Sequence, residues 1–157
     1  LLTADTIVWQ DGAVLGKPVD RADALHILDR LQGNRHQVYT GVCLSAVGKR
    51  YCFSVETTVT FRRLSVMEIE TYVDEYQPFD KAGAYGAQEC LPKNMNPCST
   101  EERAFLEQLG KPRLFEESLA ADPDKHVPII SSIDGSYFNV MGLPIFELYR
   151  ELDRFLP

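Results

Sequence analysis

Basic residues are scarce in this chain. Its 157 residues include 16 Lys and Arg against 23 Asp and Glu, so the formal net charge is −7. A surface that binds nucleic acid needs clustered Lys and Arg, and the deficit therefore argues against a nucleic-acid polymer as partner. The sequence also lacks an apolar run near the roughly 18 residues of a membrane span, and its start lacks the pattern of a signal peptide. We therefore expect a cytoplasmic protein that does not bind membranes.

Cysteine is also infrequent, with four in the chain. Residues 39–47 and 51–61 alternate in polarity on either side of Gly48-Lys49, which predicts an antiparallel hairpin that turns there. This register places Cys43 and Cys52 diagonally across the hairpin. Diagonal neighbours are roughly 7 to 8 Å apart, which disfavours a disulfide.

The other two cysteines, Cys90 and Cys98, lack the CxxC spacing and the nearby His pair of a zinc site. A structural zinc centre is therefore not expected. We expect all four thiols to be reduced.

Apolar residues are present in the amount that a folded core requires. They make up 45% of the chain, and we treat residues 1–157 as one compact domain. Capped helical stripes alternate with strand-like runs, which predicts an α/β fold. Four helices are predicted: 21–31 after Asp20, the stretch from the Ser65–Glu68 capping box to Pro78, 101–109 after the Ser99–Glu102 capping box, and the chain from about 144. The predicted strands span 1–9, 39–47, 51–61, 127–133 and, after a turn at 134–135, 136–140.

A carboxylate interrupts the apolar run at residues 1–9. Burying an ionised Asp without a partner costs several kcal/mol or more, so we expect Asp5 to handle a cation or a proton. Asp11-Gly12 predicts a tight turn that returns the chain toward Lys17. One short hairpin can thus present a carboxylate and an ammonium together, which suits phosphate chemistry. Taken singly, Asp5 can also be a strand-end or capping residue, and Lys17 a solvated turn residue.

The segment 77–88 is dense in Gly and polar residues, which indicates a site on a loop. Within it, Asp80 and Lys81 can bind a charged substrate or form a surface ion pair worth under about 1 kcal/mol. Tyr85 is expected in the core. The segment 89–125 carries Pro92, Pro97, Pro112 and Pro123, and we interpret it as an insertion.

Five ordered segments together resemble the Maf family of nucleoside triphosphate pyrophosphatases. The segments are Ala4-Asp5-Thr6, Gly16-Lys17-Pro18, residues 36–42 (HQVYTGV), residues 79–86 (FDKAGAYG) and residues 135–144 (GSYFNVMGLP). The resemblance implies an elongated domain, like that of inosine triphosphatases, in which helices flank a mixed, curved sheet and the active cleft lies between two lobes. It also implies a homodimer.

The activity that the resemblance implies is hydrolysis of a nucleoside triphosphate to the monophosphate and pyrophosphate, with Mg²⁺ or Mn²⁺. The family's acidic catalytic residue falls on Asp5, which would accept the proton of the attacking water and contact the metal. Lys17 matches a lysine that faces the phosphates, and Asp80 and Lys81 fall in a substrate-binding motif.

Thr6 and Gln88 match the positions that separate branches of the family. Their combination resembles the branch that hydrolyses dTTP and UTP, and modified pyrimidine nucleotides are further candidate substrates. A glutamine amide offers both a donor and an acceptor, which suits the edge of a pyrimidine.

The chain departs from the family pattern at its start. Maf proteins normally begin with a strand and a Ser-Pro-Arg-Arg segment whose arginines hold the triphosphate, and this sequence begins just before Ala4 without that segment. We expect the N-terminal part of the domain to be missing. The alternative function is accordingly a non-catalytic nucleotide-binding or interaction domain that has lost the phosphate-binding segment.

Overall fold

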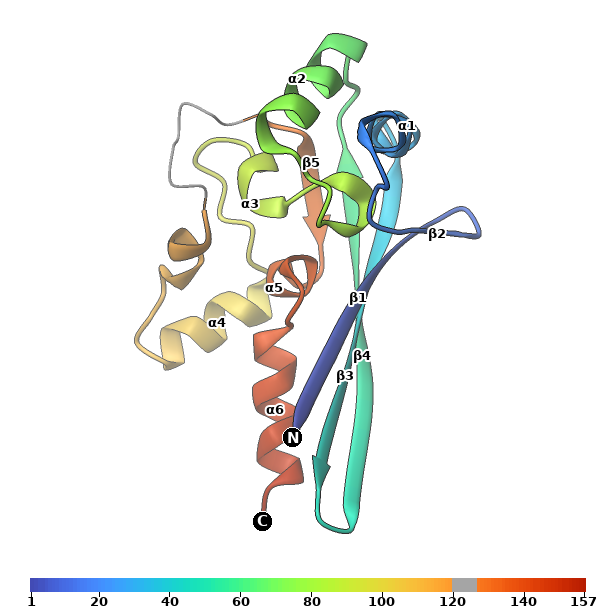
Figure 1. The fold of residues 1–157 in the computed structure, drawn as a ribbon. Helices are drawn as coiled ribbons and strands as arrows, with labels where there is room; N and C mark the ends of the chain where they lie inside the picture. The colour runs from blue at the N-terminus through green and yellow to red at the C-terminus, as the bar shows by residue number, and fades with distance from the viewer. Residues whose placement is uncertain (120–126) are drawn as a thin grey trace.

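Five strands form one sheet in the order β2-β1-β3-β4-β5 (Figure 1). The computed structural model describes residues 1–119 and 127–157. Every pairing between these strands is antiparallel. The predicted α/β fold is confirmed, but the sheet of the described residues is antiparallel where the resemblance implied a mixed one. The strands are β1 (Leu2–Gln10), β2 (Ala13–Leu15), β3 (Arg35–Ala46), β4 (Lys49–Phe61) and β5 (Ile130–Asp134).

Three of the helices begin directly after the capping residues that the sequence predicted. Asp20 accepts a hydrogen bond from the backbone N–H of Asp23, and complete capping boxes are present at Ser65 and Ser99. Among the described residues, none of the helices combines the length and apolarity needed to cross a bilayer. The helices are α1 (Arg21–Leu31), α2 (Val66–Tyr76), α3 (Ala87–Cys90), α4 (Thr100–Gln108), α5 (Tyr137–Met141) and α6 (Ile145–Phe155), with short 3₁₀ turns η1 (Ala82–Ala84) and η2 (Leu114–Ser118).

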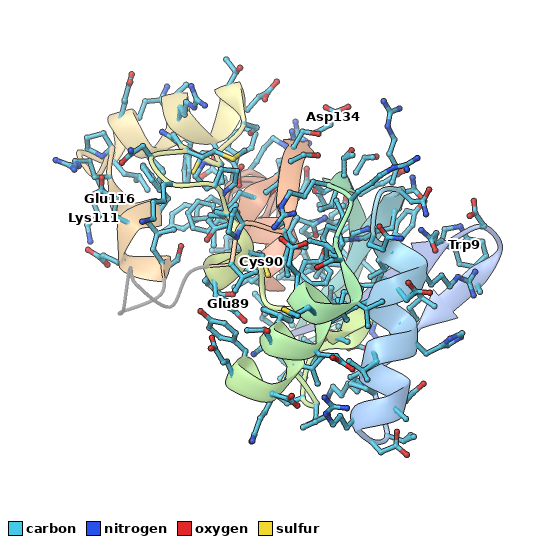
Figure 2. All side chains as sticks on the ribbon, turned by 90° about the horizontal axis from the view of Figure 1, so that it is seen from above. Trp9, Glu89, Cys90, Lys111, Glu116 and Asp134 are labelled. Carbon is cyan, nitrogen blue, oxygen red and sulfur yellow. A yellow bond between two sulfur atoms is a disulfide. The ribbon has the colours of Figure 1, made fainter. Side chains whose placement is uncertain are left out.

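The molecule has a main core at one end of the sheet and a smaller one at the other. In Figure 1, α1 and α2 lie side by side at the first end, and α6 runs beside the opposite half of the β3–β4 hairpin. The segment with α4 and η2 lies on the side away from β1, as the positions of Lys111, Glu116 and Trp9 show in Figure 2. Val42, Leu44, Leu148 and Phe155 form the smaller core.

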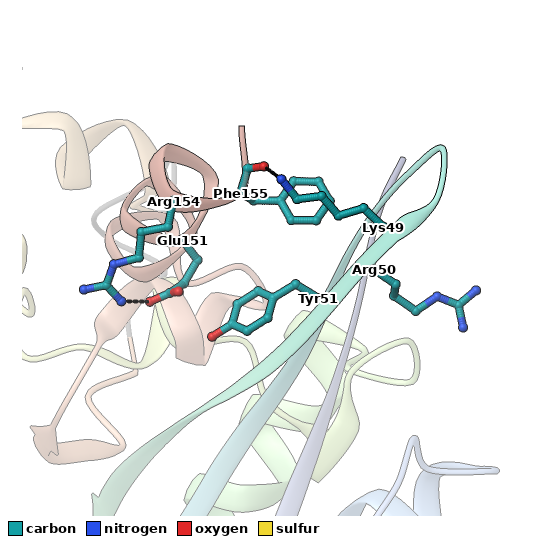
Figure 3. Close-up of a pocket in the computed structure, with 6 residues that line it drawn as sticks. All are labelled: Lys49, Arg50, Tyr51, Glu151, Arg154 and Phe155. Atoms are coloured by element: carbon teal, nitrogen blue, oxygen red, sulfur yellow. Dashed lines mark hydrogen bonds and ion pairs between the residues drawn. The ribbon is translucent and has the colours of Figure 1, made fainter. Parts of the chain in front are cut away.

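The tip of the hairpin is fastened to α6. The Lys49 ammonium donates to the Phe155 carbonyl and lies 4.3 Å from the centre of the Phe155 ring. In Figure 3, Arg50 points away from α6, while Arg154 and Glu151 of that helix form an ion pair with an N–O distance of 3.1 Å. The two Lys49 contacts hold the tip of the hairpin against the C-terminal helix.

The prediction of reduced thiols at Cys43 and Cys52 is wrong, because these residues form a disulfide. The turn consists of Val47 and Gly48, one residue earlier than predicted, so that Ala46 pairs with Lys49. This shift changes the pairing register by two residues and places Cys43 directly opposite Cys52, with 4.1 Å between the Cα atoms. Cys90 and Cys98 are free thiols, as predicted, and both are buried.

The predicted strand over 136–140 is also wrong, because these residues begin α5. The Ser136 hydroxyl accepts from the backbone N–H of Asn139 and caps the helix. The strand before it is shorter than the predicted 127–133 and begins at Ile130. Aromatic and β-branched residues favoured a strand locally, and contacts from distant segments decide for a helix.

Candidate active site

The β1–β2 hairpin forms as predicted. Asp11 and Gly12 have φ values of 47° and 82°, and they connect Gln10 to its partner Ala13. The chain then continues through Gly16, whose carbonyl accepts from the backbone N–H of Gly83 at 3.1 Å. This hydrogen bond brings the loop after α2 beside the hairpin.

Gly83 allows that loop to pack closely on β1. Its φ is +72°, and a Cβ atom at this position would lie 3.0 Å from Cγ2 of Val8 and 3.3 Å from Cε1 of Tyr85. Both the left-handed backbone and the narrow space therefore require glycine. The close packing places Asp80 and Lys81 near Lys17 and β1.

An open pocket of about 310 Å³ lies where these segments meet the end of α5. Five of the six predicted site residues line it, and they come from three segments that are distant in sequence. Gln88 is not among the residues that line the pocket; it lies half-buried in α3. The lining residues are Ala4, Asp5, Thr6, Val8, Lys17, Val38, Asp80, Lys81, Ala82, Tyr85, Val140, Met141 and Gly142.

The expectation that Asp5 is buried is wrong, because its side chain is exposed. β2 pairs only with the end of β1 from Val8 onward, and the residue opposite Asp5 on β3 is Gly41, which has no side chain. One Asp5 carboxylate oxygen accepts from the backbone N–H of Thr6 at 3.0 Å. The carboxylate is therefore oriented at the pocket and remains open to solvent.

Four charged side chains form what we call the pocket rim: Asp5, Lys17, Asp80 and Lys81. All four are exposed, and Lys81 pairs with Asp80 at an N–O distance of 3.5 Å. A pair this exposed contributes under about 1 kcal/mol to stability. The rim therefore offers two ammonium groups and two carboxylates on which the stability of the fold depends little.

A buried hydrogen-bond network, which we call the pocket floor, lies behind Thr6 and includes Thr40, Thr57 and Asn139. The Thr6 and Thr40 hydroxyl oxygens are 2.9 Å apart, and the Thr40 hydroxyl donates to the Asn139 carbonyl at 3.2 Å. The Thr6 hydroxyl oxygen also lies 3.5 Å from the Gly142 carbonyl oxygen, at the end of α5. The Asn139 amide nitrogen lies 3.1 Å from both the Val38 and Val55 carbonyl oxygens and 3.0 Å from the Thr57 hydroxyl oxygen. Its two hydrogens are therefore shared among three acceptors.

Sequence reasoning missed Asn139 as part of the site. The residue lies within the segment 135–144 that carries the resemblance, and it is fully buried. An amide inside an otherwise aromatic and apolar run indicates a buried hydrogen-bonding role, because buried polar groups need partners. The interpretation of this run as a strand concealed it.

A second buried pair supports the pocket wall. His36 Nε2 lies 2.7 Å from the Tyr85 hydroxyl, and the His36 ring also packs edge-on against Phe61. Burial lowers the pKa of His36 to about 4 and raises the pKa of Tyr85. Both side chains are therefore neutral at pH 7 and act as structural supports, as predicted for Tyr85.

The rim carboxylates have the donor chemistry of a magnesium site that is shared with phosphate. Mg²⁺ is usually bound by one or two carboxylates together with substrate phosphates and waters. Asp5 and Asp80 line the same pocket, which meets this requirement. Within residues 1–119 and 127–157, no group of three or more His, Cys, Asp or Glu side chains forms a metal site from protein ligands alone.

Comparison with known proteins gives the family of the chain. Residues 1–96 match the family model described as Maf-like protein. A dTTP/UTP pyrophosphatase of Bacteroides fragilis is 45% identical over 152 residues, which cover 97% of this chain and 61% of that protein. Proteins of the same name from Phocaeicola vulgatus and Carboxydothermus hydrogenoformans are 43% and 40% identical, over 62% and 64% of their lengths. The chain thus spans about three-fifths of the relatives it matches, and it belongs to the Maf-like family.

Proposed function

We propose that this chain carries the nucleotide site of a pyrophosphatase that hydrolyses dTTP and UTP to the monophosphate and pyrophosphate. The observation that carries the proposal is the convergence of Asp5, Lys17, Asp80 and Lys81 on one pocket. Two ammonium groups suit a polyphosphate, and a solvent-open carboxylate suits activation of water. The names of relatives at up to 45% identity support the same reaction.

Each rim residue has a role in this proposal. The Asp5 carboxylate accepts the proton of the water that attacks the triphosphate. The hydrogen bond from the Thr6 backbone N–H occupies one oxygen of that carboxylate, which leaves the other oxygen available for the proton transfer. Lys17 and Lys81 stabilise the negative charge that develops as pyrophosphate leaves.

Asp5 and Asp80 would also hold a divalent cation, Mg²⁺ or Mn²⁺. When bound, such a cation neutralises phosphate charge and polarises the phosphoryl oxygens. The contribution of the chain is two carboxylates at the edge of an open pocket, where a metal that arrives with its nucleotide can exchange water for protein ligands.

Base recognition is assigned to Thr6 and Gln88. Gln88 lies in α3, which follows directly on the loop that carries Asp80 and Lys81. A nucleotide whose phosphates lie at the rim must therefore extend toward α3 for its base to meet the Gln88 amide. Modified pyrimidine nucleotides that keep the same hydrogen-bonding edge fit the same arrangement.

The test is pyrophosphate release from dTTP, UTP, CTP and 7-methyl-GTP, each with Mg²⁺ or Mn²⁺. We expect release from dTTP and UTP that Asp5→Asn removes and that Asp11→Asn, in the turn of the same hairpin, does not change. Binding of dTTP without release would replace the proposal with that of a nucleotide-binding domain. Release that persists in Asp5→Asn would overturn the role of Asp5.

A further inference from the structure

We propose that Glu102 is a positioning residue for the pocket, acting through α5. Glu102 belongs to α4, in the segment 89–125 for which the sequence offered no role. The proposal rests on the function proposed above, because it concerns how the same pocket is held in shape. Glu102 itself does not line the pocket.

The Glu102 carboxylate is fully buried and accepts four hydrogen bonds. One, from the Ser99 backbone N–H at 3.0 Å, completes the capping box of α4. The other three come from the start of α5: the Ser136 hydroxyl at 2.8 Å and the backbone N–H groups of Tyr137 at 2.8 Å and Phe138 at 3.2 Å. A buried carboxylate is costly unless it is hydrogen-bonded, and this one is bonded mainly to α5.

The start of α5 depends on these bonds. The first N–H groups of a helix have no partner within the helix, and α5 is five residues long. Glu102 provides an acceptor for two of them and places a negative charge where the helix dipole favours it. Its bond from Ser136 also orients the hydroxyl that accepts from the Asn139 N–H at 2.9 Å.

The end of α5 forms part of the pocket. Val140, Met141 and Gly142 line it, and the Asn139 carbonyl accepts from Thr40, which contacts Thr6. A shift of α5 therefore moves one wall of the pocket and the support of Thr6. Through these contacts the α4 segment, on the far side of the molecule from β1, fixes the shape of the pocket.

The test compares Glu102→Ala and Glu102→Gln with Glu101→Ala. Glu101 is the matched control, because it lies in the same first turn of α4 but is exposed. The measurements are amide hydrogen exchange at Tyr137 and Phe138, the denaturation midpoint, and kcat and KM for dTTP.

We expect Glu102→Ala to speed exchange at both amides and to raise the KM for dTTP about tenfold, with kcat changed less than about twofold. Glu102→Gln keeps one acceptor oxygen and should recover part of the loss. Glu101→Ala should leave all of these quantities unchanged. An unchanged KM in Glu102→Ala, or an equal rise in Glu101→Ala, would overturn the proposal.

Two further controls keep the test decisive. If Glu102→Ala does not fold, Ser136→Ala removes one of the three bonds to α5 and should raise the KM in the same direction by a smaller factor. If the unaltered chain neither binds nor hydrolyses dTTP, the proposed function fails. Exchange at Tyr137 and Phe138 then still shows whether Glu102 holds α5, and unchanged exchange would overturn that step as well.

Discussion

The rim and the floor of the pocket differ in almost every physical respect. The rim residues are charged and exposed, and the fold makes little use of them; the ion pair between Lys81 and Asp80 has side chains that are 45% and 76% exposed. The floor residues are neutral and buried, and the Asn139 amide alone lies within hydrogen-bond distance of three acceptors. The groups proposed to meet a charged substrate are thus exposed to water, while the groups that fix the geometry are buried.

The difference implies that substitutions should separate into two classes. A change at the rim should alter turnover or nucleotide affinity with little effect on stability, because no buried group loses its partner. A change at the floor should reduce stability, because a buried polar group is left unpaired. The following predictions test this separation, from the largest expected effect to the smallest.

Asp5→Asn should reduce dTTP turnover about a thousandfold, within the range that general-base catalysis contributes. The free energy of unfolding should change by less than about 0.5 kcal/mol, because the side chain is exposed. Steady-state kinetics and urea unfolding of the same sample provide both values. A large loss of stability would mean that Asp5 supports the fold as the floor residues do, and the proposed difference between rim and floor would not hold.

Asn139→Ala should destabilise the protein by about 3 to 4 kcal/mol, because it removes the two buried amide hydrogens that the Val38 and Val55 carbonyls and the Thr57 hydroxyl share. The control is Asn34→Ala, which removes an exposed amide that also bonds two carbonyls. It should cost less than about 1 kcal/mol. Equal losses in urea unfolding would mean that burial of the network contributes nothing.

Lowering the pH from 7 to 4 should cost about 3 kcal/mol of stability through His36, whose pKa in the folded protein is about 4 against 6.5 in an unfolded chain. Burial favours the neutral ring, so the unfolded chain takes up the proton first as the pH falls through this window. Unfolding free energies measured across the window should fall more steeply in the unaltered protein than in His36→Gln. His26→Gln, which changes an exposed ring, should keep the steep dependence.

Gly83→Ala should cost about 2 kcal/mol, because the left-handed backbone and the contact with Val8 both oppose a Cβ atom. The variant should also raise the KM for dTTP, because Gly83 joins the rim to β1. Gly12→Ala is the matched control: its φ is +82°, but nothing lies within 4 Å of the added atom. If the two variants are equally stable, the close packing at Gly83 is unimportant.

Lys81→Ala should have the smallest effect on stability, under about 0.5 kcal/mol, because its ion pair is exposed. Its effect should instead appear as a higher KM for dTTP, most clearly at low ionic strength where screening is weak. Titrations at two salt concentrations measure it. A KM that does not change at either concentration would exclude Lys81 from the substrate site.

Local signals in the sequence predicted much of the fold. The caps at Asp20, Ser65 and Ser99 located three helices, because each cap acts on backbone groups within three residues. The turn at Asp11-Gly12 was equally local, since it needs two residues that accept positive φ. Of the six site residues that the family resemblance predicted, five line one pocket of the structure.

The errors concern contacts between distant segments. The helix α5 replaces the predicted strand over 136–140. Ser136 caps it locally, but the N–H groups of Tyr137 and Phe138 find their acceptor in Glu102, more than 30 residues away, and no local pattern reports that contact. The exposure of Asp5 depends on which part of β1 is covered by β2. The disulfide was missed through a one-residue error in the position of a turn, which in an antiparallel pair moves every partner by two positions.

The Cys43–Cys52 bond also determines what happens when the chain is cut. Lys49 and Arg50 are exposed between the two cysteines, and both are residues after which trypsin cleaves. A cut there divides the polypeptide, but the sulfur bond and the paired strands keep both pieces in one molecule. Such a nicked chain would run as a single species on a denaturing gel without reductant and as two fragments with it. The backbone can therefore be cleaved at the hairpin tip while the two fragments stay covalently linked.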